Sequence, residues 1–439
     1  KEIVGNESQE RMGMVVNEKD IEYIKRIADR ERAPLYVVGE TTDDDRFVFE
    51  QEDGVRPIDL AMADMFGHTP KTVMEDRTII EEHKPVETDP SKLDEYVRDV
   101  LSLEAVACKD WLTNKVDRSV TGRVARQQCQ GEIQLPLSDC GVVALDYDGK
   151  AGIATSIGHA PQVALVDAAA GSVMAVAESL TNIVGADLKK GLSSVSLSAN
   201  WMWPCKNPGE DAALYRAVQA CSDFVCSLGI NIPTGKDSLS MTQKYGADKV
   251  YAPGTVIISA AGEVANIRRT VSPVMVNDLN SQFYYIDFSS CALALGGSAL
   301  AQTLNRLGDA VPTVADAARF RTAFDAVQKL VRTRRLMAIH DISAGGLITA
   351  VLEMTFGNTK GGVKLYTDGF AMNGETDIVK ILFAENPAVL IQVADRQSEA
   401  VEKILDEAGV KYFPVGCPQE ERVVMLTHDG AEHLFGIDY

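Results

Sequence analysis

The sequence lacks paired cysteines and clustered histidines. Its eight cysteines are scattered without a CxxC spacing, and its six histidines stand alone. This distribution fits neither a zinc site nor a disulfide framework, so we interpret the cysteines as reduced thiols of the core. His340 stands out because Asp341 follows it. A structural imidazole is favoured there over a catalytic one.

The sequence also lacks an excess of basic residues and a long apolar run. It has 43 basic and 63 acidic side chains and a formal charge of −20, with only 6% aromatic residues. A strongly acidic chain is a poor partner for duplex nucleic acid or an anionic membrane. Apolar runs such as VIISAAG are far shorter than a membrane span, and we expect a cytoplasmic protein. A polyanionic ligand would need a cation and local donors to offset the repulsion.

The length of 439 residues exceeds what one hydrophobic core usually holds and predicts two to four domains. A polar, proline-bearing connector, EEHKPVETDPSK, follows Ile80, and connectors of this composition mark boundaries. We predict three regions, at residues 1–104, 105–267 and 268–439.

The two ends of the chain resemble one another. Without gaps, the segment from Val15 aligns with the segment from Gln392, and both predict the end of an apolar strand, a helix and a second strand that closes on Gly39 or Gly416. Each copy then enters a charged turn and another strand. The pattern predicts a βαββ unit used twice. Because the first copy begins almost at Lys1, we expect the chain to be a fragment of a longer protein.

The sequence of the middle region predicts one domain that contains both helices and strands. A strand-rich segment at residues 120–155 contains a hairpin that turns at Asp148 and Gly149, and an Ala-rich helix is predicted at residues 168–184. A strand, a helix and a strand follow. We therefore predict an α+β or mixed α/β domain of about 150 residues.

The flanking regions predict further α/β structure. A helix is expected at residues 93–108, before the middle domain. Beyond Asn266 we predict a strand at FYYIDFS, a helix at GGSALAQTLNRLG and a long helix at residues 314–335. The strand LMAIHD then delivers Asp341 to a glycine turn, and the helix LITAVLEMTF follows. The second βαββ copy closes the chain.

Four oxygen-bearing side chains suggest a hard-cation site. Glu178 and Asn182 lie one turn apart on the predicted helix, and Asp139 and Asp341 each follow an apolar run. Carboxylate and amide oxygens are the ligands that Mg²⁺ prefers, and strand ends in α/β folds meet ligands. A buried polar pair on the helix and ordinary turn residues at the two aspartates remain open as alternatives.

The segment TGKDS at residues 234–238 suggests a phosphate-binding loop. Gly235 would allow close approach to the backbone, Lys236 would supply a charge and Ser238 a hydroxyl. It is not a Walker A loop, because the four-residue spacer and the following helix are missing. A surface turn between two strands is the alternative. Arg123 and Arg126 also suit anions, but we expect them to form surface ion pairs.

These residues lie within segments that resemble phosphoribosylformylglycinamidine synthase of the large, single-chain type. The segments run along the whole chain in family order. They are NESQERM, RERAPLYVVGE, RPIDL, VTGRVARQQCQG, LPLSDC, AESLTNI, LSANWM, PGEDAALY, PTGKDSLSM, HDISAGGL and FAEN. Ile342, Ala344 and Ser138 depart from the pattern, but none of these departures removes a proposed metal ligand.

The resemblance implies a synthetase core built from two halves, each like aminoimidazole ribotide synthetase. Each half has a nucleotide domain and a second α/β domain. The chain would hold the end of the first half, to about Leu103, and all of the second. The amide-shuttling domain, the first nucleotide domain with its catalytic histidine, and the glutaminase would lie outside it. No glutaminase nucleophile motif is found, and we expect no catalytic residue in this chain.

The resemblance further implies a ligase of purine biosynthesis that uses ATP and glutamine. It converts formylglycinamide ribonucleotide to the amidine, with Mg²⁺ and ATP or ADP as cofactors. Asp139, Glu178, Asn182 and Asp341 would bind magnesium at an auxiliary nucleotide site, where the nucleotide is held and not turned over. Further contacts are implied at Ser138 and Ser343 for the nucleotide, and at Glu7, Ser8 and Gln9 for the substrate.

Other interpretations remain. A selenophosphate synthetase or a thiamine-phosphate kinase shares the superfold. Each of these enzymes would carry a catalytic Asp cluster or Cys near its N-terminus, and we find no such motif in this sequence. A nucleotide-binding scaffold without its own activity is a different class, and it describes the fragment well. We also expect a homodimer through residues 120–264, with the strand at residues 142–145 near the interface.

Overall fold

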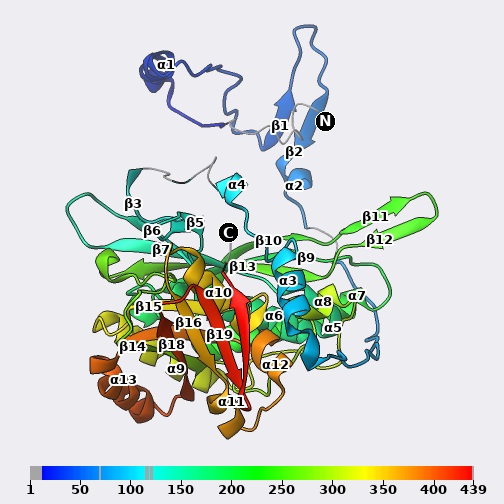
Figure 1. The fold of residues 1–439 in the computed structure, drawn as a ribbon. Coiled ribbons are helices and arrows are strands. Elements are labelled where there is room, and N and C mark those ends of the chain that lie inside the picture. Colours follow the sequence, from blue (N-terminus) through cyan, green and yellow to red (C-terminus); the bar gives the residue numbers. More distant parts are fainter. Residues whose placement is uncertain (1–11, 69–70, 114–117, 119–121, 438–439) are drawn as a thin grey trace. The chain divides into compact units, whose positions relative to one another are not determined.

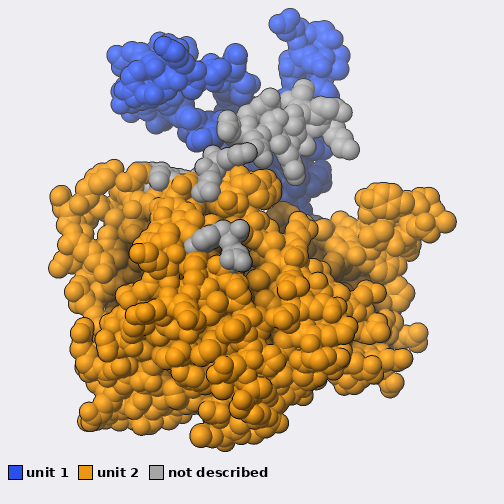
Figure 2. Space-filling model, in the orientation of Figure 1, with its two compact units in different colours: residues 1–73 blue, residues 74–439 orange. Residues whose placement is uncertain are grey.

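The computed structural model describes residues 12–68, 71–113, 118 and 122–437. The chain divides into two compact units, residues 1–73 and residues 74–439, which Figure 2 colours blue and orange. Unit 2 contains two large sheets and their covering helices. No helix in the described part of the chain is both long enough and apolar enough to cross a membrane.

Unit 1 contains a hairpin and short helices. Its elements are a 3-10 helix (Glu18–Asp20), α1 (Ile21–Arg30), β1 (Arg46–Phe49), β2 (Ile58–Ala61) and α2 (Met62–Met65). The strands β1 and β2 pair antiparallel, and an ion pair between Arg46 and Asp59 joins them. None of its described residues is buried. These elements therefore have no core among the described residues of the unit.

The first copy of the predicted βαββ unit does not form as expected. Its helix is confirmed as α1, and its last strand coincides with β1. The strand expected at residues 34–39 is wrong, because this segment has no neighbouring strand among the described residues and its Tyr36, Val37 and Val38 side chains are exposed. A strand without a partner leaves its backbone groups to water and gains nothing from pairing.

The first large sheet of unit 2 has six strands, in the order β10-β9-β13-β7-β6-β3 (Figure 1). Only β10 and β9 pair in parallel. The strands are β3 (Val124–Arg126), β6 (Gly141–Ala144), β7 (Gly152–Gly158), β9 (Val195–Met202), β10 (Asn231–Ser238) and β13 (Thr255–Val264). The predicted hairpin is confirmed as β6 and β7, and Asp148 and Gly149 lie in its loop. Smaller strands are β4 (Cys129–Gln130), β5 (Leu135–Pro136), β8 (Lys189–Leu192), β11 (Thr242–Tyr245) and β12 (Asp248–Tyr251).

Three helices, α5 (Pro161–Val166), α6 (Ala168–Ile183) and α7 (Glu210–Leu228), belong to this sheet. The predicted Ala-rich helix is confirmed as α6, which packs against β7, β13 and α7. Asp167 caps it by accepting hydrogen bonds from the N–H groups of Ala169 and Ala170. A Cβ on Gly158 would lie 2.2 Å from the Ala175 carbonyl oxygen, so glycine lets the helix approach the strand. One face of the sheet is thereby covered, while alternate residues of β7 stay exposed on the other.

The second large sheet has seven strands, in the order β15-β17-β14-β18-β16-β19-β20. They are β14 (Ser281–Asp287), β15 (Ala338–Ile342), β16 (Gly362–Tyr366), β17 (Ala388–Ala394), β18 (Tyr412–Gln419), β19 (Val423–His428) and β20 (Ala431–Gly436). The helices of this region are α8 (Ala299–Thr303), α9 (Ala317–Arg332), α10 (Gly346–Phe356), α11 (Asp368–Met372), α12 (Ile378–Phe383) and α13 (Asp395–Ala408), with a 3-10 helix at Ile267–Arg269 before them. The C-terminal βαββ unit is confirmed as β17, α13, β18 and β19.

The seven-stranded sheet is buried on both faces. Along β14, Tyr284 and Ile286 belong to a core shared with α6, α7 and α9, whereas Phe283 and Tyr285 belong to a core with α10 and α12. This alternation follows from the period of two along a strand. Because the first core also contains the covered face of the six-stranded sheet, α9 lies between the two sheets. Asp187 strengthens this junction by pairing with Arg269 and Arg332.

The helix that precedes the six-stranded sheet is shorter than the sequence predicted. The helix expected at residues 93–108 ends at Ser102 as α3 (Leu93–Ser102), after a 3-10 helix at Pro90–Lys92, and α4 (Asp110–Thr113) follows. Leu103 has an extended backbone, and the Lys109 ammonium donates to the carbonyl oxygens of Ala107 and Glu104. These bonds stabilise a turn in place of the last helical turn. The apolar face of α3 packs into the core of α10 and α12.

Candidate functional site

A cavity of about 850 Å³ lies where the open face of the six-stranded sheet meets one end of β15. The sheet contributes residues of β3, β6, β7, β9 and β13. The opposite wall comes from His340, Asp341 and Ser343 and from Glu353 of α10. Both walls belong to unit 2. The cavity therefore combines side chains from the middle and C-terminal parts of the chain.

Asp139 reaches this cavity from the loop between β5 and β6. The preceding connection, between β4 and β5, contacts the C-terminal part of unit 2 at Gly131, where a Cβ would lie 2.3 Å from the carbonyl oxygen of Gly357. The N–H group of Ile133 donates to the same carbonyl oxygen at 3.2 Å. Only glycine permits this approach, and Gly131 also has a positive φ of 77°. The contact positions Asp139 beside β15.

His340 lies between two carboxylates. Its Nδ1 atom is 2.7 Å from Asp139 Oδ1, and its Nε2 atom is 3.0 Å from Glu353 Oε2. The imidazole is almost fully buried. Burial alone would lower its pKa, but the charges and hydrogen bonds of Asp139 and Glu353 outweigh burial and raise the pKa of His340 well above its usual value. Two acceptors on one ring require both nitrogens to donate, so we assign an imidazolium. This agrees with the structural role favoured by the sequence.

Asp341 follows His340 in β15 and is only 4% exposed. Its Oδ1 atom is 3.5 Å from His340 Nδ1, whereas its buried Oδ2 atom has no hydrogen-bond partner in the described structure. Burial, together with the charge of Asp139, raises the pKa of Asp341 to about 7. Burial also raises the pKa of Asp139, although His340 opposes this. A buried carboxylate oxygen without a partner is costly, and a cation would satisfy it.

Glu178 and Asn182 lie one turn apart on α6, as the sequence predicted. Asn182 lines the cavity, and its Nδ2 donates to the Ile157 carbonyl oxygen at 3.0 Å, which directs the amide oxygen away from that strand. Glu178 Oε2 accepts from the His159 N–H group at 2.6 Å. Burial raises the pKa of Glu178 to about 8, and the nearby charges of Asp341 and Glu385 add to the effect. Glu178 is thus influenced by Asp341, but among the described residues it is neither part of the cavity lining nor one of the groups whose ligand atoms lie within 4.8 Å of one another.

Two further carboxylates were not predicted from the sequence: Glu353 lines the cavity, whereas Glu385 does not. Glu353 contacts His340, and Glu385 accepts hydrogen bonds from the N–H groups of Ala299 and Gly345, both at 2.7 Å. Burial raises the pKa of Glu385 to about 7. Glu353 sits within an apolar helix, and a lone carboxylate in such a stretch is a signal that could have identified it. In the sequence, Glu385 was noted only as part of the FAEN segment that carries the family resemblance.

Ser138 and Ser343 both line the cavity, next to Asp139 and Asp341. Ser138 Oγ donates to the Gln127 carbonyl oxygen at 2.7 Å, so its hydroxyl oxygen can still accept. The predicted substrate segment of Glu7, Ser8 and Gln9 lies outside the described residues. Its proposed role stays a prediction.

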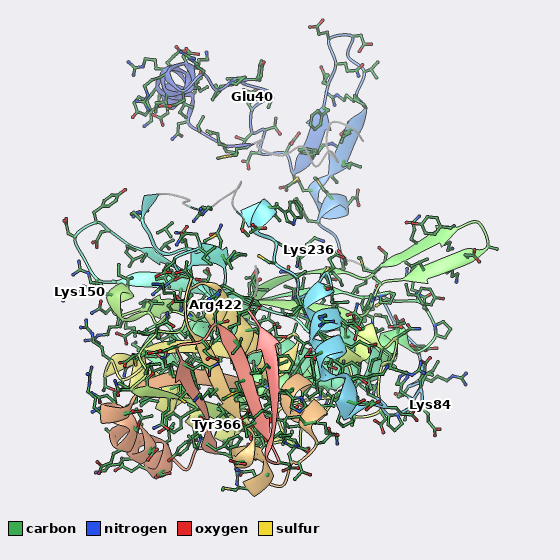
Figure 3. All side chains as sticks on the ribbon, viewed as in Figure 1. Glu40, Lys84, Lys150, Lys236, Tyr366 and Arg422 are labelled. Atoms are coloured by element: carbon green, nitrogen blue, oxygen red, sulfur yellow. The ribbon has the colours of Figure 1, made fainter. Side chains whose placement is uncertain are left out.

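The segment TGKDS is not a loop, and that expectation was wrong. Residues 234–238 form the end of strand β10, paired in parallel with β9. A Cβ on Gly235 would lie 2.1 Å from the Ala199 carbonyl oxygen, so this glycine serves the approach of two strands. Lys236 is exposed (Figure 3), and its Nζ lies 3.0 Å from Ser238 Oγ. Of this segment only Thr234 lines the cavity, and the structure does not bring Gly235, Lys236 or Ser238 to it.

The donors of this site suit a hard divalent cation. Ligand atoms of Asp139, His340 and Asp341 lie within 4.8 Å of one another, and Asn182 lines the same cavity. His340 is not a suitable ligand as an imidazolium, but the two aspartates, Glu178 and the Asn182 amide offer oxygen. The partnerless Asp341 Oδ2 and the raised pKa values fit carboxylates that a cation would neutralise. The site can thus hold Mg²⁺ and, through it, a phosphorylated ligand.

Fold and site define a mixed α/β protein with a buried carboxylate cluster where two sheets meet. Residues 108–263 match the family described as the FGAR-AT PurM_N-like domain. Residues 287–427 match the AIR synthase related protein, C-terminal domain. Two regions of the chain thus match these two domain families, and the predicted mixed α/β fold class is confirmed.

Solved structures support the same fold. T. maritima PurL complexed with FGAR aligns with a TM-score of 0.62 and 13% identity, covering 80% of this chain and 53% of that one. T. maritima PurL complexed with ATP has a TM-score of 0.55 and 15% identity, covering 79% and 52%. The structure of PurLQS from Thermotoga maritima has a TM-score of 0.52 and 15% identity, covering 68% and 46%. The chain thus spans about half the length of the structures that it matches.

Proposed function

We propose that unit 2 carries an Mg²⁺-dependent nucleotide site of a phosphoribosylformylglycinamidine synthase of the large, single-chain type. The observation that carries the proposal is the pair Asp139 and Asp341, brought to one cavity with an unsatisfied buried oxygen. Glu178 and Asn182 would complete the ligand set, and Ser138 and Ser343 would contact the nucleotide. A bound Mg²⁺ would neutralise these carboxylates and hold phosphate oxygens.

The proposed reaction belongs to the complete enzyme. There ATP would activate the formamide oxygen of formylglycinamide ribonucleotide, and ammonia derived from glutamine would then displace the phosphate. Structures titled as PurL complexes with FGAR, ATP and ADP share the fold and support this assignment. Within this chain we assign the site a holding role. His340 is fixed between two carboxylates by hydrogen bonds at both ring nitrogens, which leaves neither nitrogen free to act as a base.

Ligand release and calorimetry test the nucleotide site. Purified protein is denatured and the released small molecules are identified by mass spectrometry, and Mg-ADP is titrated into nucleotide-free protein. We expect ADP or ATP to be released, or Mg-ADP to bind in a way that EDTA abolishes. Absence of both release and binding would refute the site.

An assay supplied with ammonia tests whether this chain only holds its nucleotide or also forms product. The chain is incubated with formylglycinamide ribonucleotide, ATP, Mg²⁺ and ammonium salt, in parallel with a complete enzyme of the same family. We expect product from the complete enzyme and none above background from this chain, because the proposed site holds its nucleotide. Product formed by this chain alone would show that the site turns nucleotide over.

A further inference from the structure

Arg126 is a partly buried cation among the residues that line the cavity. The sequence analysis expected it to form a surface ion pair, but no carboxylate of a described residue lies within ion-pair distance of its guanidinium. Its Nη1 donates to Gln130 Oε1 at 2.6 Å and its Nη2 to the Thr270 carbonyl oxygen at 2.7 Å. Its buried Nε–H group has no partner among the described residues. That expectation was therefore wrong for Arg126.

Neutral acceptors alone do not balance a partly buried guanidinium. Burial lowers the pKa of Arg126, which records the cost of removing the charge from water. Arginine stays protonated in proteins, so this cost is met by an anion or remains unmet. The two neutral acceptors hold the guanidinium plane at the edge of β3, in the wall of the cavity. Such a fixed plane suits the forked recognition of a phosphate or carboxylate.

The cavity also carries the other sign of charge, from Asp341 and Glu353 of the opposite wall and from Asp139, whose charge favours the protonated Arg126 guanidinium. Asp139, Asp341 and Glu353 line the same cavity, together with His340. Arg118 also lines it and donates to the side chains of Gln127 and Gln134, again with no carboxylate partner in the described structure. The cavity thus has a carboxylate wall that suits a cation and an arginine wall that suits an anion. A ligand with phosphate groups chelated to a divalent cation matches both walls.

We infer that Arg126 binds the phosphate tail of the cavity ligand directly, on the side opposite the cation. This inference rests on the proposed function and adds a residue and a charge pattern to it. The cation would neutralise one edge of the phosphate tail through the aspartates, and the guanidinium would bind another edge. In a chain with a formal charge of −20, such a local cation offsets the repulsion that the phosphate tail meets. Selectivity for phosphorylated ligands over the free nucleoside follows.

Paired arginine variants test the inference. Arg126→Met removes the guanidinium, Arg126→Lys keeps the charge without the planar fork, and Arg123→Met is the control. Arg123 is exposed, donates to the Leu145 carbonyl oxygen and does not line the cavity. Mg-ADP and adenosine are titrated into each variant by calorimetry, and thermal unfolding shows whether each is folded.

We expect Arg126→Met to weaken Mg-ADP binding by about 10- to 100-fold and to leave adenosine binding within about twofold. Arg126→Lys should fall between Arg126→Met and wild type, and Arg123→Met should match wild type. If Arg126→Met does not fold, the Arg126→Lys result decides. Equal Mg-ADP affinities of wild type and the folded Arg126 variants, or equal losses for ADP and adenosine, would overturn the inference. A wild-type protein that binds neither ligand would instead refute the proposed function.

Discussion

Asp139 and His340 are 201 positions apart in the sequence, yet their side chains touch. Close by, Gly131 has no Cβ, which lets the connection between β4 and β5 lie against Gly357. At the level of single residues, the site is a set of carboxylates held closer together than their charges favour. Their raised pKa values express that repulsion together with burial.

Replacing Asn182 by leucine tests the proposed cation ligand on α6. Leucine keeps helix propensity and size, and it removes the amide oxygen in the cavity together with the Nδ2 hydrogen bond to Ile157. We expect Mg-ADP affinity to fall by about 1 to 3 kcal/mol in calorimetry. Asn280→Leu, at an exposed turn, is the matched control and should bind as wild type does. An unchanged affinity for Asn182→Leu with Mg²⁺ present would count against the ligand set.

Glu385 makes the stability of the metal-free protein depend on pH. Burial raises its pKa from 4.5 to about 7. Between these values the folded protein keeps a proton that the unfolded chain releases, so the free energy of unfolding falls as pH rises. Glu385→Gln keeps an acceptor oxygen for Ala299 and Gly345 without titrating.

We therefore expect the stability of wild type relative to Glu385→Gln to decrease by up to ~3 kcal/mol between about pH 4.5 and pH 7. Urea unfolding at several pH values in EDTA measures this difference. Glu399→Gln, at an exposed position, is the control, and its free energy of unfolding should change with pH as that of wild type does. Parallel profiles for wild type and Glu385→Gln would contradict the assigned pKa.

At the level of elements, the sequence of β10 is compatible both with a phosphate-binding loop and with an edge strand. The composition TGKDS suits a phosphate loop, but Gly235 sits opposite Ala199 in a parallel pair. The strand is an edge strand of the six-stranded sheet. Its glycine is required by the spacing of the two backbones and not by a ligand.

Gly235→Val tests this explanation. The added side chain would begin 2.1 Å from the Ala199 carbonyl oxygen, so β10 must separate from β9. We expect a loss of at least ~2 kcal/mol in unfolding free energy and faster amide exchange along both strands. Gly39→Val, where a Cβ would meet nothing within 4 Å, should be neutral. Retained exchange protection in Gly235→Val would favour the loop interpretation.

At the level of the whole molecule, the six-stranded sheet has one covered and one open face. The open face carries Val143 and Ile153, 37% and 38% exposed, and Ile157, 56% exposed. Some of these side chains also line the cavity. An apolar sheet face of this kind is a site of association, and a closed twofold dimer is the commonest way to bury it.

We therefore predict a homodimer through residues 120–264. Light scattering at micromolar concentration should give twice the chain mass of 47.5 kDa. Ile157→Asp should give a monomer, because a charge would be buried at the centre of the interface. Leu434→Asp, at an exposed position of β20, should stay dimeric. A monomeric wild type, or a dimer unaffected by Ile157→Asp, would exclude this interface.

The elements that could be predicted from the amino-acid sequence are those whose signals are local. The Ala-rich pattern fixed α6 with Glu178 and Asn182 on one face, and apolar runs placed Asp139 and Asp341 beside strands. Periodicity and turn chemistry act within a few residues, so these predictions needed no knowledge of distant contacts. The C-terminal βαββ unit was predicted for the same reason.

Which residues meet depends on contacts between distant parts of the chain. These contacts place Glu353 beside His340, make TGKDS part of an edge strand and bring the partly buried Arg126 to the lining of the cavity. Among the described residues the structure also gives residues 34–39 no partner strand, although their local pattern matches a segment that does form a strand. Pairing, burial and charge balance depend on neighbours far away in the sequence, and a local pattern carries no information about which neighbours arrive.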